Sequence, residues 1–291
     1  MAQVKRDWES KLVLLLVLPI VAVEAAWQVG HWIAISAPAV IWTLAVSVLL
    51  GLITWKLHAA TPWAAVAGAA MTASMMFSTL SPPYKPLHTA LAPITAVFVL
   101  AFAATRIGQG QKQRLGTAER TQGRSAAQVA ANLGVAALIS SPFARSSLAG
   151  SRLFAHAAPI PALLLTAGLA ALAEAAADTV SSEVGQVFGG LPRMITTLRR
   201  VQPGCDGAIS SLGVLAGISA AAVIAAAGTL AMRRGVHIFV VSGTAGVFGF
   251  LFDSLLGATV ERRGWLNNDA VNFLSTASSA VFALAAMVFL R

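Results

Sequence analysis

The sequence predicts an all-α fold, a polytopic bundle of about nine transmembrane helices. Of the 291 residues, 57% are hydrophobic and 11% are charged, whereas an ordinary soluble domain is about 25% charged. Apolar runs recur along the whole chain, and most charged residues lie in the connections between them. No basic stripe on a soluble domain is present, so nucleic-acid binding is not expected. The single cysteine, Cys205, excludes a disulfide framework and a cysteine zinc site.

The apolar runs are matched against the length of about 20 residues that a helix needs to cross a bilayer. Nine qualify: 12–29, 33–55, 62–80, 88–105, 125–142, 158–180, 207–231, 236–259 and 270–290. The first is interpreted as an uncleaved span, because Asp7 and Glu9 dilute the positive charge typical of a signal peptide. Larger side chains in the first two runs predict a peripheral, lipid-facing pair within residues 1–60. Residues 61–291 are then expected to form one catalytic bundle.

The distribution of basic residues predicts the orientation. With the amino terminus inside, nine spans put 14 of the 20 lysines and arginines on the cytoplasmic side, as the positive-inside rule requires. Three long polar connections, 106–124, 181–206 and 260–269, then share that face. We therefore expect a multi-pass protein of a bacterial inner membrane with an active site facing the cytoplasm.

Acidic residues at membrane depth are the most informative feature. Six of the eleven lie within or beside apolar runs: Glu174, Asp178, Glu183, Asp206, Asp253 and Asp269. Ionisable groups there are costly and usually functional. Glu174 and Asp178 are four residues apart on one helix face, where two carboxylates repel unless a proton or a cation joins them. Mg²⁺ is the simplest such cation, since it accepts carboxylates, water and phosphates. For Glu174 a structural role between helices is the alternative.

Two segments have features of a phosphate site. A glycine turn with Gly204, Asp206 and Gly207 opens the seventh run behind Arg200, and N–H groups at a helix start favour bound phosphate. The alternative for Asp206 is that it caps this helix. The eighth run has glycines three residues apart that allow close approach on the side leading to Asp253.

Further polar side chains flank the fifth and ninth runs. Arg124 precedes Gln128 and Asn132, and these two amides can instead form helix–helix hydrogen bonds. Asn268, Asp269 and Asn272 begin the ninth run, where N-capping is the alternative for the first two. The remaining basic residues of 106–124 are expected to form a solvated loop.

Together these groups indicate phosphoryl transfer, in which catalysis is mainly positioning and charge neutralisation. Walker A, kinase glycine-loop and zinc-helix motifs are absent from the sequence. No histidine lies in the polar groups, so general-base chemistry by histidine is not supported.

Four ordered motifs carry a family resemblance. They are Ala177-Asp-Thr-Val-Ser-Ser-Glu-Val-Gly185, Pro203-Gly-Cys-Asp-Gly-Ala-Ile-Ser210, Asp253-Ser-Leu-Leu-Gly-Ala258 and Asn268-Asp-Ala-Val-Asn-Phe273. With Gly123-Arg124 and Gln128-Val-Ala-Ala-Asn132, they resemble the membrane family of transmembrane protein 19 and the plastid phytyl-phosphate kinase, over about residues 65–290.

The resemblance implies a CTP-dependent kinase that phosphorylates an isoprenyl monophosphate such as phytyl or geranylgeranyl phosphate. Another nucleoside triphosphate is possible as donor. Metal and phosphate ligands would be Asp178, Glu183, Asp206 and Asp253, with Mg²⁺ as cofactor. The expected nucleotide and phosphate contacts are Arg124, Gln128, Asn132, Arg200, Gly204, Asp206, Gly207, Asn268, Asp269 and Asn272. Cys205 stands where threonine is expected, which leaves a hydroxyl contact there in doubt.

Two alternatives remain open. A CTP-dependent cytidylyltransferase acting on a lipid phosphate needs similar ligands but releases pyrophosphate. A transporter would use Glu174 and Asp178 as a midplane site, and inverted-repeat symmetry would favour it. The sequence shows no such repeat.

Overall fold

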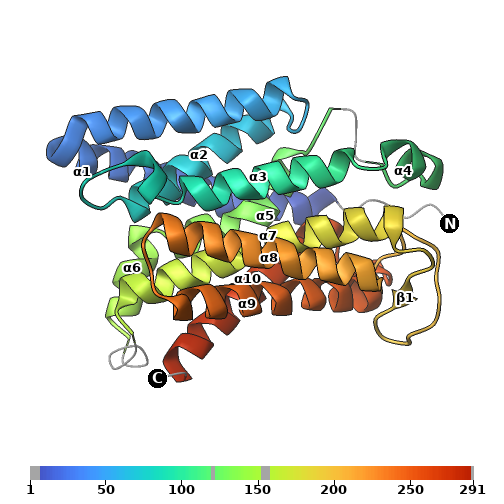
Figure 1. The fold of residues 1–291 in the computed structure, drawn as a ribbon. Coiled ribbons are helices and arrows are strands. Elements are labelled where there is room, and N and C mark those ends of the chain that lie inside the picture. Colours follow the sequence, from blue (N-terminus) through green and yellow to red (C-terminus); the bar gives the residue numbers. More distant parts are fainter. Residues whose placement is uncertain (1–6, 119–121, 152–157, 290–291) are drawn as a thin grey trace.

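The computed structural model describes residues 7–118, 122–151 and 158–289, and Figure 1 shows them as a bundle of helices. The helical elements are α1 (Asp7–Lys56), α2 (Pro62–Thr79), η1 (Pro86–His88), α3 (Leu91–Arg106), α4 (Gln109–Leu115), α5 (Ala126–Ile139), α6 (Pro142–Ala149), α7 (Ile160–Phe188), α8 (Ser211–Ala231), α9 (Val236–Leu256), η2 (Gly257–Glu261) and α10 (Asn268–Phe289). Strands β1 (Arg193–Met194) and β2 (Ala208–Ile209) form a small antiparallel hairpin, with Arg193 opposite Ile209. The predicted all-α membrane class is confirmed.

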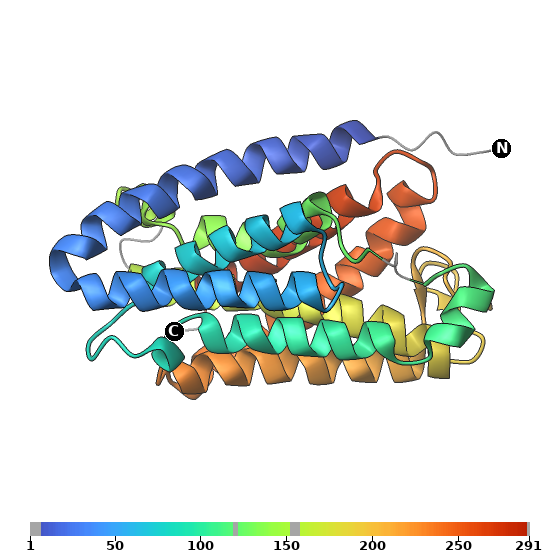
Figure 2. The ribbon, with the colours of Figure 1, turned by 90° about the horizontal axis from the view of Figure 1, so that it is seen from above.

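Helix α1 contains the first two predicted runs. Its helical geometry is interrupted at Ser36, where φ is −156° and ψ is 89°, and Pro38 follows. Figure 2 shows the chain doubling back at the far end of this element, so that its two halves lie antiparallel. The single element α1 therefore makes two passes along the bundle.

The predicted number of about nine spans is higher than the number of helices that could cross a membrane. Among the described residues, five helices are long and apolar enough, or up to seven if the bent pairs α3–α4 and α5–α6 each count as one span. These pairs bend by 66° and 47°. Helices α3 and α5 have 16 and 14 residues, fewer than the roughly 20 that a span needs. Helix α2 has 18 residues and is long enough, but it is not apolar enough to be counted. Helices α3 and α5 are therefore too short to be counted as single spans.

Polar residues at the starts of these short helices explain where they begin. Thr61 accepts a hydrogen bond from the N–H of Ala64, and Pro62 follows at the first helical position, which suits its fixed φ and missing N–H. Helix α5 begins with a capping box formed by Ser125 and Gln128. Both ends of such a box satisfy otherwise unpaired N–H groups.

Helix α7 is the centre of the bundle. Buried residues make up 78% of its most apolar segment, compared with 28% for α1, and α3, α5, α8, α9 and α10 all pack against it. Glycines allow the closest of these approaches. A Cβ on Gly246 would lie 2.7 Å from the Cβ of Ala173, and one on Gly249 would lie 2.5 Å from Cγ of Glu174. The glycines of the eighth run therefore bring α9 against the acidic part of α7.

The start of α1 also holds the loop before α10 in place. Val13 and Val17 belong to the main hydrophobic core, so this half of α1 is more than a lipid-facing appendage. Glu9 is buried, and its Oε2 accepts a hydrogen bond from the N–H of Asn267 at 2.6 Å. Ser10 donates to Oδ2 of Asp269 at 2.6 Å. The first helix thereby fixes the start of α10.

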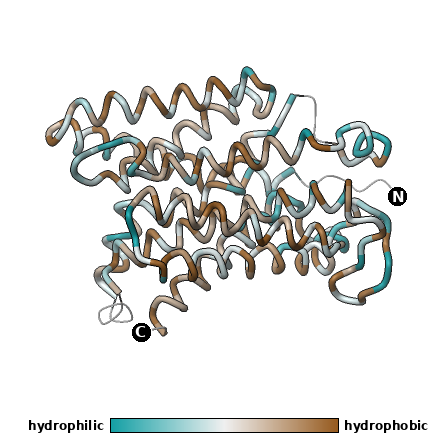
Figure 3. The backbone as a smooth tube through the Cα atoms, viewed as in Figure 1, coloured by the Kyte–Doolittle hydropathy of each residue, from teal (hydrophilic) through white to brown (hydrophobic). Residues whose placement is uncertain are grey.

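Three polar connections gather at one end of the bundle, together with the start of α1. Figures 1 and 2 show α4, the β1–β2 hairpin and the turn between α9 and α10 on this side. In Figure 3 the connections are largely hydrophilic and the helix middles largely hydrophobic. This arrangement agrees with the predicted grouping of the connections on one face.

Candidate functional site

A polar cavity of about 230 Å³ opens at this end of the bundle. We call it the acidic cavity, because its lining includes four carboxylates and no basic side chain. Its walls come from the end of α7, the 192–210 segment, the end of α9 with η2, and the start of α10. The lining carboxylates and amides are Asp178, Gln186, Asp206, Asp253, Glu261 and Asn268. The antiparallel order of the helices brings together residues that are up to 90 positions apart in the sequence.

Asp178 of α7 and Asp253 of α9 face each other in this cavity, and their carboxyl groups interact directly. Asn272 supports Asp253 from α10. With its amide oriented to place donors against acceptors, Nδ2 of Asn272 lies 3.2 Å from Oδ2 of Asp253 and 3.2 Å from the backbone oxygen of Asn268. Three predicted site residues are thus joined in one hydrogen-bonded group.

Glu174 lies one turn deeper on α7. Its side chain is buried and next to both Asp178 and Asp253. Oε1 of Glu174 is one of the few buried polar atoms in the described residues that lack a hydrogen-bond partner. An unpaired oxygen on a buried, charged carboxylate is costly, and a proton or a cation would offset this cost.

Glycine backbones also line the acidic cavity. Gly207 has φ +73°, and a Cβ there would lie 2.3 Å from the N–H nitrogen of Ala258. A Cβ on Gly257 would in turn lie 2.8 Å from the nitrogen of Gly207. The predicted glycine turn therefore packs backbone to backbone against η2, a π-helical turn of the kind often found at functional sites.

This close approach gives a testable prediction. Gly207→Ala should lower the free energy of unfolding by more than about 2 kcal/mol, because it adds a backbone clash to a strained φ. Gly190→Ala is the matched control, since Gly190 also has a left-handed φ of +64° but has open space around it. It should cost about 1 kcal/mol or less. Thermal unfolding of both variants in detergent checks the difference, and equal losses would contradict the close contact.

Asp206 lies at the rim of the acidic cavity, and its side chain is exposed. Desolvation raises the pKa of its carboxyl group, and the nearby guanidinium of Arg262 opposes that shift. Asp206 is not the helix cap, because the side chain of Ser210 accepts the N–H of Gly213 at the start of α8. The capping alternative for Asp206 therefore does not hold.

Glu261 lines the acidic cavity, although the sequence pattern does not mark it as a site residue. It ends η2 and lines the cavity beside Asp206. In the sequence, Glu261 stands directly before Arg262-Arg263, and such a charged group is typical of the polar end of any membrane span. The π-helical turn that aims it inward leaves no clear mark in the sequence.

Arg124 lies on the other side of α7. Its Nη2 donates to Oγ1 of Thr179 at 3.2 Å, and its guanidinium interacts electrostatically with Asp178. The backbone is clamped as well, because its N–H donates to Ala59 and its carbonyl accepts from Thr61, both at 3.0 Å. Arg124 therefore holds a fixed position beside the acidic cavity, without lining it.

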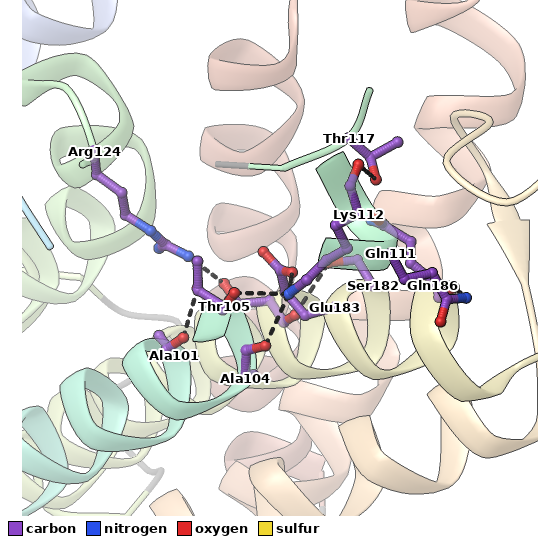
Figure 4. A network of polar contacts seen from close by, with 11 residues as sticks. Ala101, Ala104, Thr105, Gln111, Lys112, Thr117, Arg124, Ser182, Glu183 and Gln186 are labelled. Carbon is purple, nitrogen blue, oxygen red and sulfur yellow. Dashed lines mark hydrogen bonds and ion pairs between the residues drawn. The ribbon is translucent and has the colours of Figure 1, made fainter. Parts of the chain in front are cut away.

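Glu183 does not line the acidic cavity and instead forms an ion pair. Figure 4 shows Nζ of Lys112 between the carboxylate of Glu183 and the end of α3. The Nζ atom lies 2.6 Å from Oε2 of Glu183, 2.7 Å from the oxygen of Thr105 and 3.1 Å from the oxygen of Ala104. All three ammonium donors are therefore used. Lys112 is 1% exposed, so the expectation that it belongs to a solvated loop is wrong.

Four other predicted residues also lie outside the acidic cavity. Gln128 is used in the capping box of α5, and Asn132 donates to the backbone oxygen of Gln128 at 2.7 Å. Arg200 is exposed, and its backbone forms an isolated antiparallel β-bridge with Arg193 beside the hairpin. Asp269 accepts the hydroxyl of Ser10. The expected caps of α10 are displaced by one position, since Oδ1 of Asn267 accepts the N–H of Ala270.

The predicted four-carboxylate ligand set is not assembled in this conformation. Within the described ranges, no three His, Cys, Asp or Glu side chains are arranged to hold one metal ion. The facing pair of Asp178 and Asp253 does fit Mg²⁺, which binds one or two carboxylates and keeps water and substrate phosphates as its other ligands.

Comparison with curated proteins shows relatives in archaea, cyanobacteria and plants. The chain is 45% identical over 109 residues to the uncharacterized membrane protein MJ0933 of Methanocaldococcus jannaschii, a match that covers 37% of this chain and 45% of that protein. It is 30% identical to the uncharacterized membrane protein sll0875 of Synechocystis, over 66% of this chain and 71% of that one. It is 27% identical to the chloroplastic protein VTE6 of Arabidopsis thaliana, over 68% of this chain and 58% of VTE6. The chain thus spans about half the length of MJ0933 and of VTE6. No solved structure matches the chain.

A family profile described as integral membrane protein DUF92 matches residues 45–280. That range contains all four motifs and every residue of the acidic cavity. The match confirms the family resemblance drawn from the motifs and the multi-pass membrane character of the chain. The chain belongs to the DUF92 family of integral membrane proteins.

Proposed function

We propose that the protein is a membrane phosphotransferase that moves the terminal phosphoryl group of a nucleoside triphosphate onto an isoprenyl monophosphate. CTP is the expected donor, and the products are the isoprenyl diphosphate and the nucleoside diphosphate. The observation that carries this proposal is the pairing of Asp178 and Asp253 in a polar cavity walled by the Gly207 backbone. The resemblance of the four motifs to the family of the plastid phytyl-phosphate kinase supports a kinase.

In the proposed reaction an oxygen of the acceptor phosphate attacks the γ-phosphorus of the nucleotide. The bond from that phosphorus to the β–γ bridging oxygen breaks, and the nucleoside diphosphate leaves with the electron pair. The acceptor is already ionised at neutral pH, so the step needs no catalytic base. This agrees with the absence of histidine from the lining of the acidic cavity.

The chain's own residues have positioning and electrostatic roles. Asp178 and Asp253 would hold Mg²⁺, which when bound neutralises charge on the transferring phosphates. The turn at Gly204 and Gly207 lines the acidic cavity and would present its backbone to the nucleotide phosphates. Arg124, which lies on the other side of α7 from the acidic cavity, would bind the acceptor phosphate. The cavity would open to the cytoplasm, as the positive-inside rule favours.

Product analysis tests this function. The purified protein with Mg²⁺ is incubated with CTP or ATP labelled at the γ-phosphorus and with phytyl or geranylgeranyl monophosphate. Label in an isoprenyl diphosphate is the expected result. Release of pyrophosphate with CMP on the lipid would instead indicate a cytidylyltransferase. Absence of transfer from every nucleotide to every acceptor would contradict an enzyme of this class.

A further inference from the structure

A second cavity of about 180 Å³ lies on the other side of α7, between the second half of α1, α2, α3 and α5. We call it the apolar cavity, because small and hydrophobic side chains make up most of its lining. Its lining on α3 extends from Ile94 to Arg106, a distance of about 18 Å at 1.5 Å per residue. The shape is therefore elongated along the membrane helices, as a hydrocarbon chain requires.

The basic side chains of this cavity gather at one end, whereas the polar residues Thr72 and Asn132 line it farther along. Arg106 and Arg124 line it there, with His58 and Gln109. The lining contains no aspartate or glutamate. Nη2 of Arg106 donates to the backbone oxygen of Leu57 at 2.8 Å, which holds its guanidinium at the end of α3. An apolar cavity with two arginines at one end complements a molecule with one anionic head and one hydrocarbon chain.

The two cavities flank the same stretch of α7. Ala175 lines the apolar cavity, and Asp178, less than one turn later, lines the acidic cavity. Arg124 connects them, because it lines the apolar cavity while it contacts Thr179 and interacts with Asp178. A phosphate held at Arg124 would therefore lie next to the carboxylates of the acidic cavity.

We propose that the apolar cavity binds the hydrocarbon chain of the isoprenyl monophosphate, with its phosphate at Arg106 and Arg124. This inference rests on the proposed function and adds the place of the acceptor. Helices α8 and α9 pack closely on α7 and contribute nothing to this lining. The residues that enclose the hydrocarbon chain then limit the length of the acceptor.

Gly68 on α2 offers the sharpest test. It lines the apolar cavity, and a Cβ there would meet only Cγ1 of Val129, at an ordinary 3.7 Å. A leucine would therefore project into the cavity without a backbone clash. Gly243 on α9 is the matched control: its Cβ would meet only Ala225 at 3.6 Å, and it lines neither cavity.

The experiment measures binding of labelled geranylgeranyl monophosphate to the protein in detergent without nucleotide. Gly68→Leu should weaken binding by at least about tenfold, because each displaced methylene loses its burial. Gly243→Leu should bind as the wild type does. Dimethylallyl monophosphate, which has a short chain, should bind equally to all three proteins. In the transfer assay Gly68→Leu should shift preference toward shorter acceptors.

Several outcomes would overturn the proposal. Unchanged binding of the long-chain phosphate by Gly68→Leu contradicts it, and so does an equal loss in Gly243→Leu. Competition by inorganic phosphate as effective as by the long-chain ester would mean that the site recognises phosphate alone. If Gly68→Leu does not fold, Val97→Phe fills the same cavity from α3. Because binding is measured without nucleotide, wild-type binding without turnover would reject the kinase function and keep the lipid site.

Discussion

Asp253→Asn is expected to reduce phosphoryl transfer by at least about a hundredfold, a loss typical of removing one group that stabilises charge in the transition state. Asp253 faces Asp178 and is held by Asn272. A neutral amide leaves Asp178 as the only carboxylate of the facing pair, so the proposed Mg²⁺ would lose one of its two carboxylate ligands.

The same substitution should leave the fold at least as stable as the wild type. Asp178, Asp253 and Glu174 are like charges close together in a buried region, and removal of one charge relieves their repulsion. The variant is measured for transfer and for thermal unfolding in detergent. Lost transfer with retained stability is the expected pair of results, which separates a role in the reaction from a role in folding.

Glu24→Gln is the matched control for this experiment. It is also a carboxylate-to-amide change on a membrane helix, but Glu24 contacts the N–H of Phe143 near the start of α6, outside the lining of both cavities. It should retain wild-type transfer. More than half of the wild-type transfer in Asp253→Asn would remove this residue from the site.

Much of this architecture follows from patterns that are local in the sequence. Each predicted run contains a helix because its apolar length is continuous. Asp178, Asp206, Asp253 and Asn268 meet in one cavity because each stands at an end of a run, and antiparallel helices bring alternate ends to the same side. The glycine turn was recognisable because positive φ and close backbone approach both require glycine at position 207.

Pairing between distant residues could not be predicted in the same way. Lys112 and Glu183 are 71 residues apart, and nothing local marks Lys112 as different from the exposed Arg114 on the same short helix. Its burial depends on the 66° bend between α3 and α4, which turns the side chain back onto the end of α3. Glu261 was missed for a related reason, since its direction depends on the π-helical turn.

Lys112→Met is expected to lower the free energy of unfolding by about 3 kcal/mol, as removal of one partner from a buried ion pair does. The change leaves Glu183 without its cation and leaves two carbonyl groups at the end of α3 without a donor. Arg114→Met is the matched control, because Arg114 is exposed on the same helix, and it should change stability by less than about 0.5 kcal/mol. Thermal unfolding in detergent compares the two.

The double variant Lys112→Met with Glu183→Gln decides what Glu183 does. Both charges are then gone, so a large part of the stability lost in the single variant should return. If the pair only holds α4 against α7, transfer activity should return with stability, and Glu183 is a positioning residue. If Glu183 binds metal or phosphate during the reaction, as the family motif implies, the double variant is stable and inactive. Glu183 is not among the residues that line the acidic cavity, and its 2.6 Å contact with Lys112 favours the first result.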